Sequence, residues 1–221
     1  MIVACVMKSG GRYDRTWVDR LFRGVSAHWD MPQPLRFICL SDEKWAAPYE
    51  VHPLRFGFPG WWSKIELFQR FSHFHAPTLY LDLDTVIAGP MSNILARPMK
   101  TNERGFRVMR DPYNATLQSA VMRWTGHWMH YTGHIIFSEF VRKPAHYMRA
   151  YELQGDQAFI RDVVIELSKS WSYFTPAEVM SFKAEWQLSS SPVTTAIQFH
   201  GDPKPDALPD DHELKRKWID Q

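Results

Sequence analysis

The sequence predicts an α/β fold in which strands and helices alternate along the first half of the chain. Three short apolar runs, at residues 2–7, 35–40 and 78–81, have the length and unbroken hydrophobic character of strands buried on both faces. Apolar residues at helical spacing separate the first two runs, which makes a βαβ unit with parallel strands. Because open sheets of this kind bind ligands beyond the carboxyl ends of their strands, we expect the first half to bind a nucleotide.

The same spacing rules predict the other elements. Asp14 can cap a first helix, whose apolar residues run from Trp17 to Trp29. Two more helices are expected at about 61–74 and 156–167. Shorter strands, which make the sheet mixed, are expected at 106–109, 120–124, 134–137, 171–175 and 195–200.

The composition is that of one globular domain. The 221 residues are 45% hydrophobic and 23% charged with a net charge of +2, which excludes a disordered chain. There is no run of 18 apolar residues and no signal-peptide pattern, so we expect a cytoplasmic protein without a transmembrane segment. Cys5 and Cys39 lie inside apolar runs and are expected to be buried, reduced thiols. We place one domain at 1–205 and a charged C-terminal tail at 206–221.

Two aspartates follow the third apolar run directly. Asp82 and Asp84 are two residues apart at a strand end, so their side chains leave the same face with Cα atoms about 6.5 Å apart. Ionised carboxylates this close repel each other, and a divalent cation would remove the repulsion. Mg²⁺ and Mn²⁺ prefer such oxygen ligands and often connect them to substrate phosphates. The alternative is a pair of solvated loop aspartates.

Two enzyme classes have an Asp-x-Asp after an apolar strand. In haloacid-dehalogenase-type phosphatases the first aspartate is a nucleophile and the second an acid/base, and residues 79–85 match that pattern. The motif closes the first strand of that fold, however, whereas a βαβ unit precedes it here. In the second class, which transfers sugars from nucleotide diphosphates, the pair holds the metal that holds the diphosphate.

Further motifs resemble the second class. Tyr80-Leu81-Asp82-Leu83-Asp84-Thr85-Val86 is similar to the metal motif of GT-A type glycosyltransferases, especially family 8, which includes glycogenin and bacterial lipopolysaccharide galactosyltransferases. Residues 118–122 resemble the family's Asn-Ser-Gly-Val-Met segment, and 156–157 its Asp-Gln. Residues 200–205 resemble its His…Gly-x-x-Lys-Pro signature, although family 8 usually has two residues between that His and Gly, which are adjacent here.

The resemblance implies a short, divergent protein with the GT-A (Rossmann-like) fold, a mixed central sheet flanked by helices. It implies a metal-dependent transferase that moves a hexose from a nucleotide-diphosphate sugar, expected to be a UDP-sugar, with retention of configuration. An inverting enzyme would need a carboxylate base, for which Asp111, Glu152 or Asp156 could serve. A phosphatase with Asp82 as nucleophile and a catalytically silent nucleotide-sugar-binding module stay open as alternatives.

The resemblance also implies roles for the residues around the diphosphate. Asp82, Asp84 and His200 would bind Mn²⁺ or Mg²⁺. Gly201 would let the backbone approach the phosphates, and Lys204 would offer them a positive charge. The metal and Lys204 would then stabilise the departing diphosphate.

The rest of the donor is expected to contact residues from several segments. Met7, Lys8 and Tyr13 are expected at the base, and Lys64 at the phosphates or sugar. Gln118 and Asp156 are expected at the sugar hydroxyls, and Gln157 near the anomeric carbon. Asp156 and Gln157 are the two residues assigned to catalysis.

The acceptor is expected to be a glycan, a lipid-linked saccharide or, as a minor hypothesis, a modified nucleic-acid base. The aromatic and histidine-rich segment 124–134 could form a platform for it. The basic residues 215–217 would suit an anionic surface, but a solvated helix end is the ordinary interpretation.

Overall fold

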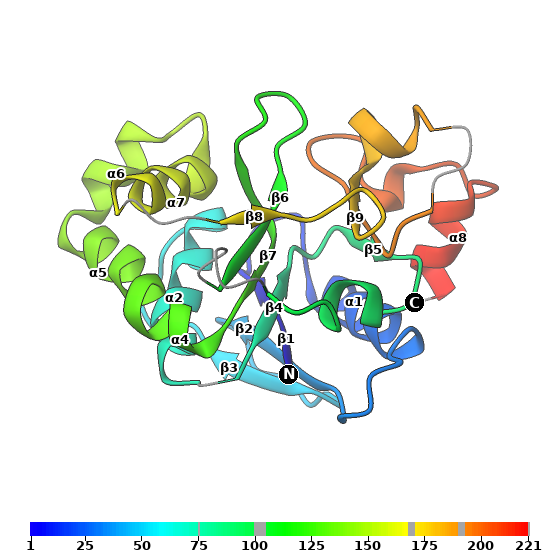
Figure 1. The fold of residues 1–221 in the computed structure, drawn as a ribbon, viewed down its shortest axis with the longest axis horizontal. Helices are drawn as coiled ribbons and strands as arrows, with labels where there is room; N and C mark the ends of the chain where they lie inside the picture. Colours follow the sequence, from blue (N-terminus) through cyan, green and yellow to red (C-terminus); the bar gives the residue numbers. More distant parts are fainter. Residues whose placement is uncertain (75, 100–104, 168–170, 190–192, 221) are drawn as a thin grey trace.

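The computed structural model describes residues 1–74, 76–99, 105–167, 171–189 and 193–220, and within them a seven-stranded mixed sheet forms the centre of the protein (Figure 1). The strand order is β3-β2-β1-β4-β7-β6-β8. The first four strands are parallel, β7 is antiparallel to β4 and β6, and β8 is parallel to β6. Their bounds are β1 Ile2–Met7, β2 Arg36–Ser41, β3 Glu50–Pro53, β4 Thr78–Leu81, β6 Phe106–Arg110, β7 Leu117–Trp124 and β8 Ser172–Tyr173. The prediction of a mixed sheet is confirmed.

A second, three-stranded sheet lies beside the first, in the order β5-β10-β9. Its strands are β5 Thr85–Ile87, β10 Ala196–Gln198 and β9 Val179–Ser181, so it joins the segment after the aspartate pair to the last strand of the chain. Arg107 of β6 and Glu178 connect the two sheets through two hydrogen bonds of 2.8 Å, and both side chains are almost completely buried.

Helices cover both faces of the main sheet (Figure 1). The helices α2, α4, α5, α6 and α7 lie on one side, and α1 and α8 on the other. Their bounds, with that of the short α3, are α1 Arg15–Ala27, α2 Glu66–Arg70, α3 Ser92–Leu95, α4 Gly126–Trp128, α5 His134–Arg142, α6 Pro144–Ala150, α7 Gly155–Glu166 and α8 Glu213–Asp220. None of the described helices has the length and apolar character needed to span a membrane.

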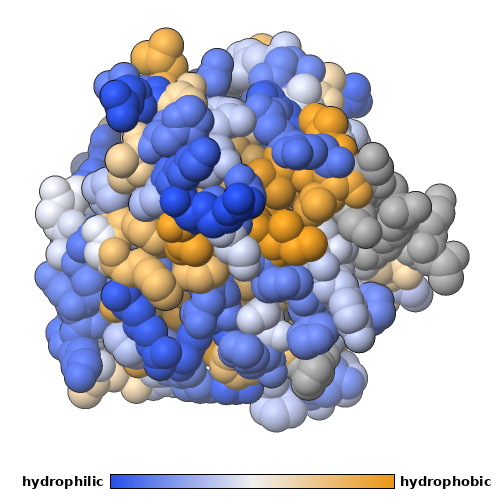
Figure 2. Space-filling view, turned by 90° about the vertical axis from the view of Figure 1, so that its left-hand side faces the viewer, coloured by the Kyte–Doolittle hydropathy of each residue, from blue (hydrophilic) through white to orange (hydrophobic). Residues whose placement is uncertain are grey.

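Two hydrophobic cores result, one on each face of the sheet. Successive strand residues point to opposite faces. In β1 the residues Val3, Cys5 and Met7 therefore pack in the core under α1, whereas Ile2 and Ala4 pack in the core under the larger helical layer. Both cysteines are buried and free, as predicted. On the side where α5 and α6 lie, the surface is mostly hydrophilic, with hydrophobic atoms gathered near its centre (Figure 2).

Several predicted elements need correction. The Asp14 side chain caps α1 by accepting a hydrogen bond from the Thr16 backbone, as predicted, but α1 ends at Ala27, before Trp29. The helix predicted at 61–74 is divided into a 3₁₀ turn at Gly60–Ile65, the five-residue α2 and a second 3₁₀ turn at Phe71–His73.

The strand predicted at 134–137 is wrong, because these residues begin α5. Ile136, Phe137 and Phe140 are buried at spacings of one, three and four, which places them on one face of a helix.

The last segment packs against the first helix. Leu214 and Trp218 of α8 are buried, and the Trp218 ring lies 4.9 Å from that of Trp17 in α1. The Arg12 guanidinium also forms ion pairs with Asp202 and Asp206. Residues 206–220 therefore contribute to the core below α1, and the domain end placed at residue 205 stays a prediction.

Candidate functional site

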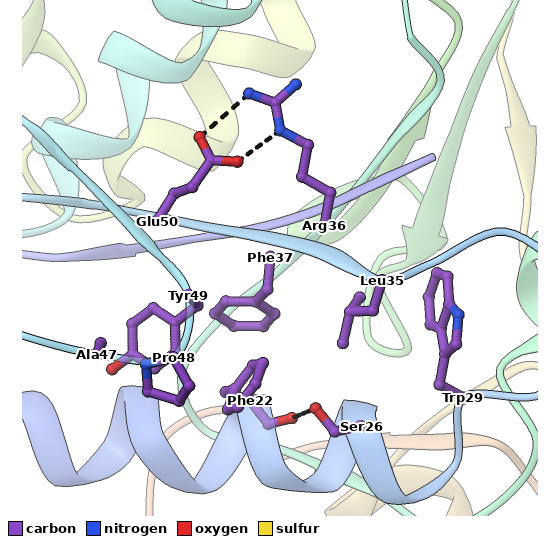
Figure 3. Close-up of a pocket in the computed structure, with 10 residues that line it drawn as sticks. All are labelled: Phe22, Ser26, Trp29, Leu35, Arg36, Phe37, Ala47, Pro48, Tyr49 and Glu50. Carbon is purple, nitrogen blue, oxygen red and sulfur yellow. Dashed lines mark hydrogen bonds and ion pairs between the residues drawn. The ribbon is translucent and has the colours of Figure 1, made fainter.

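Most of the predicted site residues line one cavity of about 640 Å³ at the carboxyl ends of β1 and β4. These residues are Lys8, Tyr13, Lys64, Asp82, Asp84, Gln118, Asp156, Gln157, His200, Gly201 and Lys204. Met7 is the exception: the residue is 1% exposed and packs in the core rather than lining the cavity. A second cavity of equal volume lies between α1 and the start of β2 (Figure 3). Aromatic and apolar side chains line it together with the Arg36–Glu50 ion pair, and it contains none of the predicted residues.

Asp82, which is partly exposed, belongs to a compact cluster of charges with the buried Lys64 and Asp156. The Lys64 ammonium lies 3.0 Å from Asp82 Oδ1 and 3.3 Å from Asp156 Oδ2, and its side chain is 9% exposed. Ser119 Oγ donates a 2.9 Å hydrogen bond to Asp156, and the Tyr80 hydroxyl donates one to Asp82. Lys64 thus sits between two carboxylates, one from the end of β4 and one from the first turn of α7.

The environment shifts the pKa values of this cluster. Burial raises the pKa of Asp82 and of Asp156, and the Lys64 ammonium offsets part of that change. Burial by itself lowers the pKa of Lys64, but the two carboxylates raise it above its ordinary value. Lys64 is therefore expected to stay protonated near pH 7.

Asp84 is enclosed by three donors from distant parts of the chain. Tyr13 Oη donates to Asp84 Oδ2 over 2.9 Å, and Gln198 Nε2 donates to Asp84 Oδ1 over 3.2 Å. The Lys204 ammonium pairs with Asp84 Oδ2 and also donates to the Phe199 carbonyl over 2.7 Å. Burial, followed by the Asp84 charge, raises the pKa of Tyr13 far above its ordinary value, so Tyr13 remains a neutral donor.

Gln198, rather than His200, is the neighbour of Asp84. His200 lines the cavity, but its ring nitrogens contact Ser181 Oγ at 3.3 Å and Tyr113 Oη at 3.1 Å. Among the described residues, no group of three or more His, Cys, Asp or Glu side chains could hold a metal ion, so the predicted trio with His200 is not assembled. Burial, then the charges of Lys183 and Lys204, lowers the pKa of His200 and keeps it neutral near pH 7.

Sequence reasoning missed Gln198, although a signal was present. Family 8 usually has two residues between its His and Gly, and counting back from Gly201 at that spacing leads to residue 198. The Gln198 side chain is 2% exposed, and its Oε1 is buried without a hydrogen-bond partner in the described part of the chain. An unpartnered buried acceptor beside a carboxylate is costly unless a ligand completes it.

The sugar-end residues are also gathered at the cavity. Gln157 Nε2 donates a 3.0 Å hydrogen bond to Asp111 Oδ2. Gln118 is 5% exposed, and its Oε1 has no partner among the described residues. Together with Asp156, these side chains line the cavity with hydrogen-bonding groups.

At the end of the cavity where the base is expected, Lys8 is held by an ion pair. Lys8 pairs with Asp42, which also accepts two hydrogen bonds from Ser9, of 2.9 Å and 2.7 Å. Burial alone would raise the pKa of Asp42, but Lys8 and Ser9 lower it to about 2. Lys8 therefore stabilises the loop after β1 and leaves Tyr13 as the aromatic residue facing the cavity from this loop.

The aromatic segment 124–134 does not line the cavity. Trp124 and Trp128 are 0% and 2% exposed and belong to the core under the helical layer. Instead, the cavity is bordered by Trp61 and Leu153, which are 57% and 95% exposed. No sequence motif marks these two residues.

No protein-family model matches the sequence, and no curated protein matches it. Solved structures match it over nearly its whole length. The glycosyltransferase GlyE from Streptococcus pneumoniae TIGR4 is 11% identical with a TM-score of 0.69, over 99% of this chain and 60% of GlyE. The galactosyltransferase LgtC, solved with donor and acceptor sugar analogues, is 12% identical with a TM-score of 0.68, over 98% of this chain and 94% of LgtC. The bifunctional glycosyltransferase WbbM is 12% identical with a TM-score of 0.66, and this chain spans 49% of it.

The protein therefore has the α/β fold of GT-A type glycosyltransferases, and the resemblance predicted from the motifs is confirmed at the level of the fold.

Proposed function

We propose that the protein is a metal-dependent glycosyltransferase that moves a hexose from a nucleotide-diphosphate sugar, expected to be a UDP-sugar, with retention of configuration. The single observation that carries this proposal is the convergence of Asp82, Asp84, Gln198 and Lys204 on one cavity at the carboxyl ends of β1 and β4. Ligands of open α/β sheets bind at such edges.

The charge of the cavity indicates why a cation would be needed. In the direct ion pairs of this cluster, the three carboxylates of Asp82, Asp84 and Asp156 face the two ammonium groups of Lys64 and Lys204, so the paired groups carry one more negative than positive charge. A diphosphate brings further negative charge to this wall. A divalent cation would reverse the sign of the cluster and allow the diphosphate to approach.

The residues present fit a divalent cation in their chemistry. Asp82 and Asp84 offer carboxylate oxygens, and Gln198 Oε1 is a buried amide oxygen without a partner among the described residues. Hard oxygen ligands are those that Mg²⁺ and Mn²⁺ prefer. We therefore assign Gln198, and not His200, to the third protein position. A cation bound there would act as a Lewis acid toward the departing phosphate.

The protein's own residues supply the rest of the proposed mechanism. Lys204 lies beside Asp84 and would stabilise the negative charge that the diphosphate gains when its bond to the anomeric carbon breaks. Gln118 and Asp156 would hold the sugar hydroxyls, and Lys64 fixes Asp156 relative to Asp82. Gln157, oriented by Asp111, would lie near the anomeric carbon.

For the acceptor we propose the rim formed by Trp61 and Leu153. An exposed indole at the mouth of a polar cavity is suited to packing on a sugar ring. This assignment favours an acceptor glycan or lipid-linked saccharide.

The geometry gives no support to a phosphatase with Asp82 as nucleophile. Both carboxylate oxygens of Asp82 are engaged, one by Lys64 and Tyr80 and the other by Lys64 alone. These donors fix the orientation of Asp82, and the result that would favour the phosphatase is hydrolysis of an aryl phosphate through a phosphoaspartyl intermediate.

The first test is thermal unfolding with UDP, GDP, CDP and ADP, each with and without Mn²⁺. A ligand at about one hundred times its dissociation constant adds about 2.7 kcal/mol, or about 5–10 °C in Tm for a chain of this size. We expect one nucleotide to stabilise the protein in a Mn²⁺-dependent way, and Asp84→Asn to lose the effect. Release of the nucleoside diphosphate from the matching sugar donor then measures turnover. Absence of a shift with every nucleotide would overturn the proposal.

A further inference from the structure

A lysine outside every motif lies against the glycine of the cavity wall. Lys183 follows β9, in the π-helical turn Phe182–Trp186. The strands β9 and β10 pair in parallel, with Ser181 opposite Gln198. The residues that follow the two strands therefore leave the sheet at the same edge. Lys183 Nζ lies 3.2 Å from the position that a Cβ on Gly201 would occupy.

Gly201 is suited to this close approach. Its φ of +60° is a conformation that L side chains rarely adopt, and a methyl group there would press on the Lys183 ammonium. Gly201 itself lines the cavity, so the Lys183 ammonium lies next to the cavity wall.

Unlike the lysines that line the cavity, Lys183 has no hydrogen bond or ion pair with any residue that the structure describes. Lys8 is paired with Asp42, Lys64 with Asp82 and Asp156, and Lys204 with Asp84. Lys183 nevertheless lies close to the cavity, since its ammonium approaches Gly201, which lines it. Lys183 is thus a positive charge that no described carboxylate compensates.

We propose that Lys183 binds the diphosphate of the donor, and that with Gly201 and Lys204 it forms a phosphate-binding cradle. The proposal rests on the proposed function, since it names the residues that would hold that substrate. Lys204 must exchange its contact with Asp84 for a phosphate, whereas Lys183 has no such contact to lose. A compact, mobile ammonium of this kind is a common ligand of phosphate oxygens.

The test compares UDP with UMP by calorimetric titration in the presence of Mn²⁺, on wild type and Lys183→Met. If the thermal screen selects another base, the di- and monophosphate of that base are used. We expect the variant to lose at least 10-fold in affinity for the diphosphate and less for the monophosphate, so that their ratio falls. Lys183→Arg should restore part of the ratio. Lys44→Met, at an exposed lysine with no ion pair among the described residues, is the control and should match wild type.

Each result decides the proposal. An unchanged ratio in Lys183→Met, with diphosphate binding intact in the wild type, overturns the role of Lys183 and leaves the proposed function standing. An equal loss for both nucleotides indicates a structural role and also overturns it. If the wild type binds no nucleotide, the proposed function fails together with this inference. Weaker dependence of diphosphate affinity on NaCl in the variant would support a lost charge contact.

Discussion

Lys64 provides a stringent test of the structure, because the substitution Lys64→Met removes the charge between one buried and one partly exposed carboxylate while keeping the apolar stem. The ammonium lies 3.0 Å from Asp82 and 3.3 Å from Asp156. At an effective dielectric constant of about 20, each attraction is worth about 5 kcal/mol before the cost of removing the charges from water. Truncating one partner of a buried pair typically costs about 3–5 kcal/mol.

We expect a loss near the lower end of that range, about 3 kcal/mol. The Asp82 side chain is 26% exposed and is therefore partly solvated. In the variant, Tyr80 can still donate to Asp82, and Ser119 to Asp156. Urea denaturation measures the effect, and with a slope of about 2 kcal/mol per molar the midpoint should fall by about 1.5 M. In Lys64→Met/Asp156→Asn, the loss should be smaller than the sum of the single losses by at least about 1 kcal/mol.

The control is a more exposed pair of the same kind. The side chains of Lys8 and Asp42 are each 24% exposed. Lys8→Met should therefore lower the free energy of unfolding by less than about 1 kcal/mol. A Lys64→Met loss as small as that of the control, or strictly additive losses in the double variant, would refute the reasoning.

Three further predictions concern stability. Glu178→Gln should cost about 3–5 kcal/mol in urea denaturation, because the Arg107 charge stays buried. Burial raises the pKa of Glu178, but Arg107 lowers it further, so that the pKa lies below 4.5. The free energies of unfolding of wild type and variant should therefore converge as the pH falls through that lowered pKa, and a difference that stays constant with pH contradicts this. Asp42→Asn should lower the free energy of unfolding by about 1 kcal/mol at pH 7, because the pKa of Asp42 is lowered to about 2 in the folded protein. This stabilisation should disappear between about pH 4 and pH 2, where the carboxylate becomes protonated. Gly155→Ala should cost about 1–2 kcal/mol and alter tryptophan fluorescence, since its φ is +66° and its Cβ would lie 2.9 Å from Trp61 Nε1; unchanged fluorescence argues against that contact.

The elements that the sequence predicts well carry strong local signals. β1 is an unbroken apolar run, and α1 combines a capping aspartate with a regular apolar stripe. The run at 134–137 is too short for its period to separate a strand from a helix, and the deciding residue, Phe140, lies beyond it. The 3₁₀ turns around α2 depend on tertiary contacts that no local pattern records.

The same distinction applies to the candidate site. The aspartate pair, Lys64 and Lys204 converge as expected because strand ends and following loops meet at one edge of the sheet. Met7 shares a face of β1 with Val3 and Cys5, and only the structure shows that this face packs in the core under α1. Lys183 could not have been found, since its position depends on the pairing of β9 with β10.

The enclosure of Asp84 has a consequence for the order in which the protein is assembled. Its three side-chain donors are 71, 114 and 120 positions away in the sequence. During synthesis, a chain that has reached residue 190 already contains the aspartate but neither Gln198 nor Lys204. The donor cavity is therefore expected to be among the last parts of the protein to form, because its contacts join residues far apart in the sequence and closing such long loops costs entropy. A ligand bound there would hold β10 in place, so nucleotide binding should protect the amides of residues 196–199 from hydrogen exchange more than those of β1.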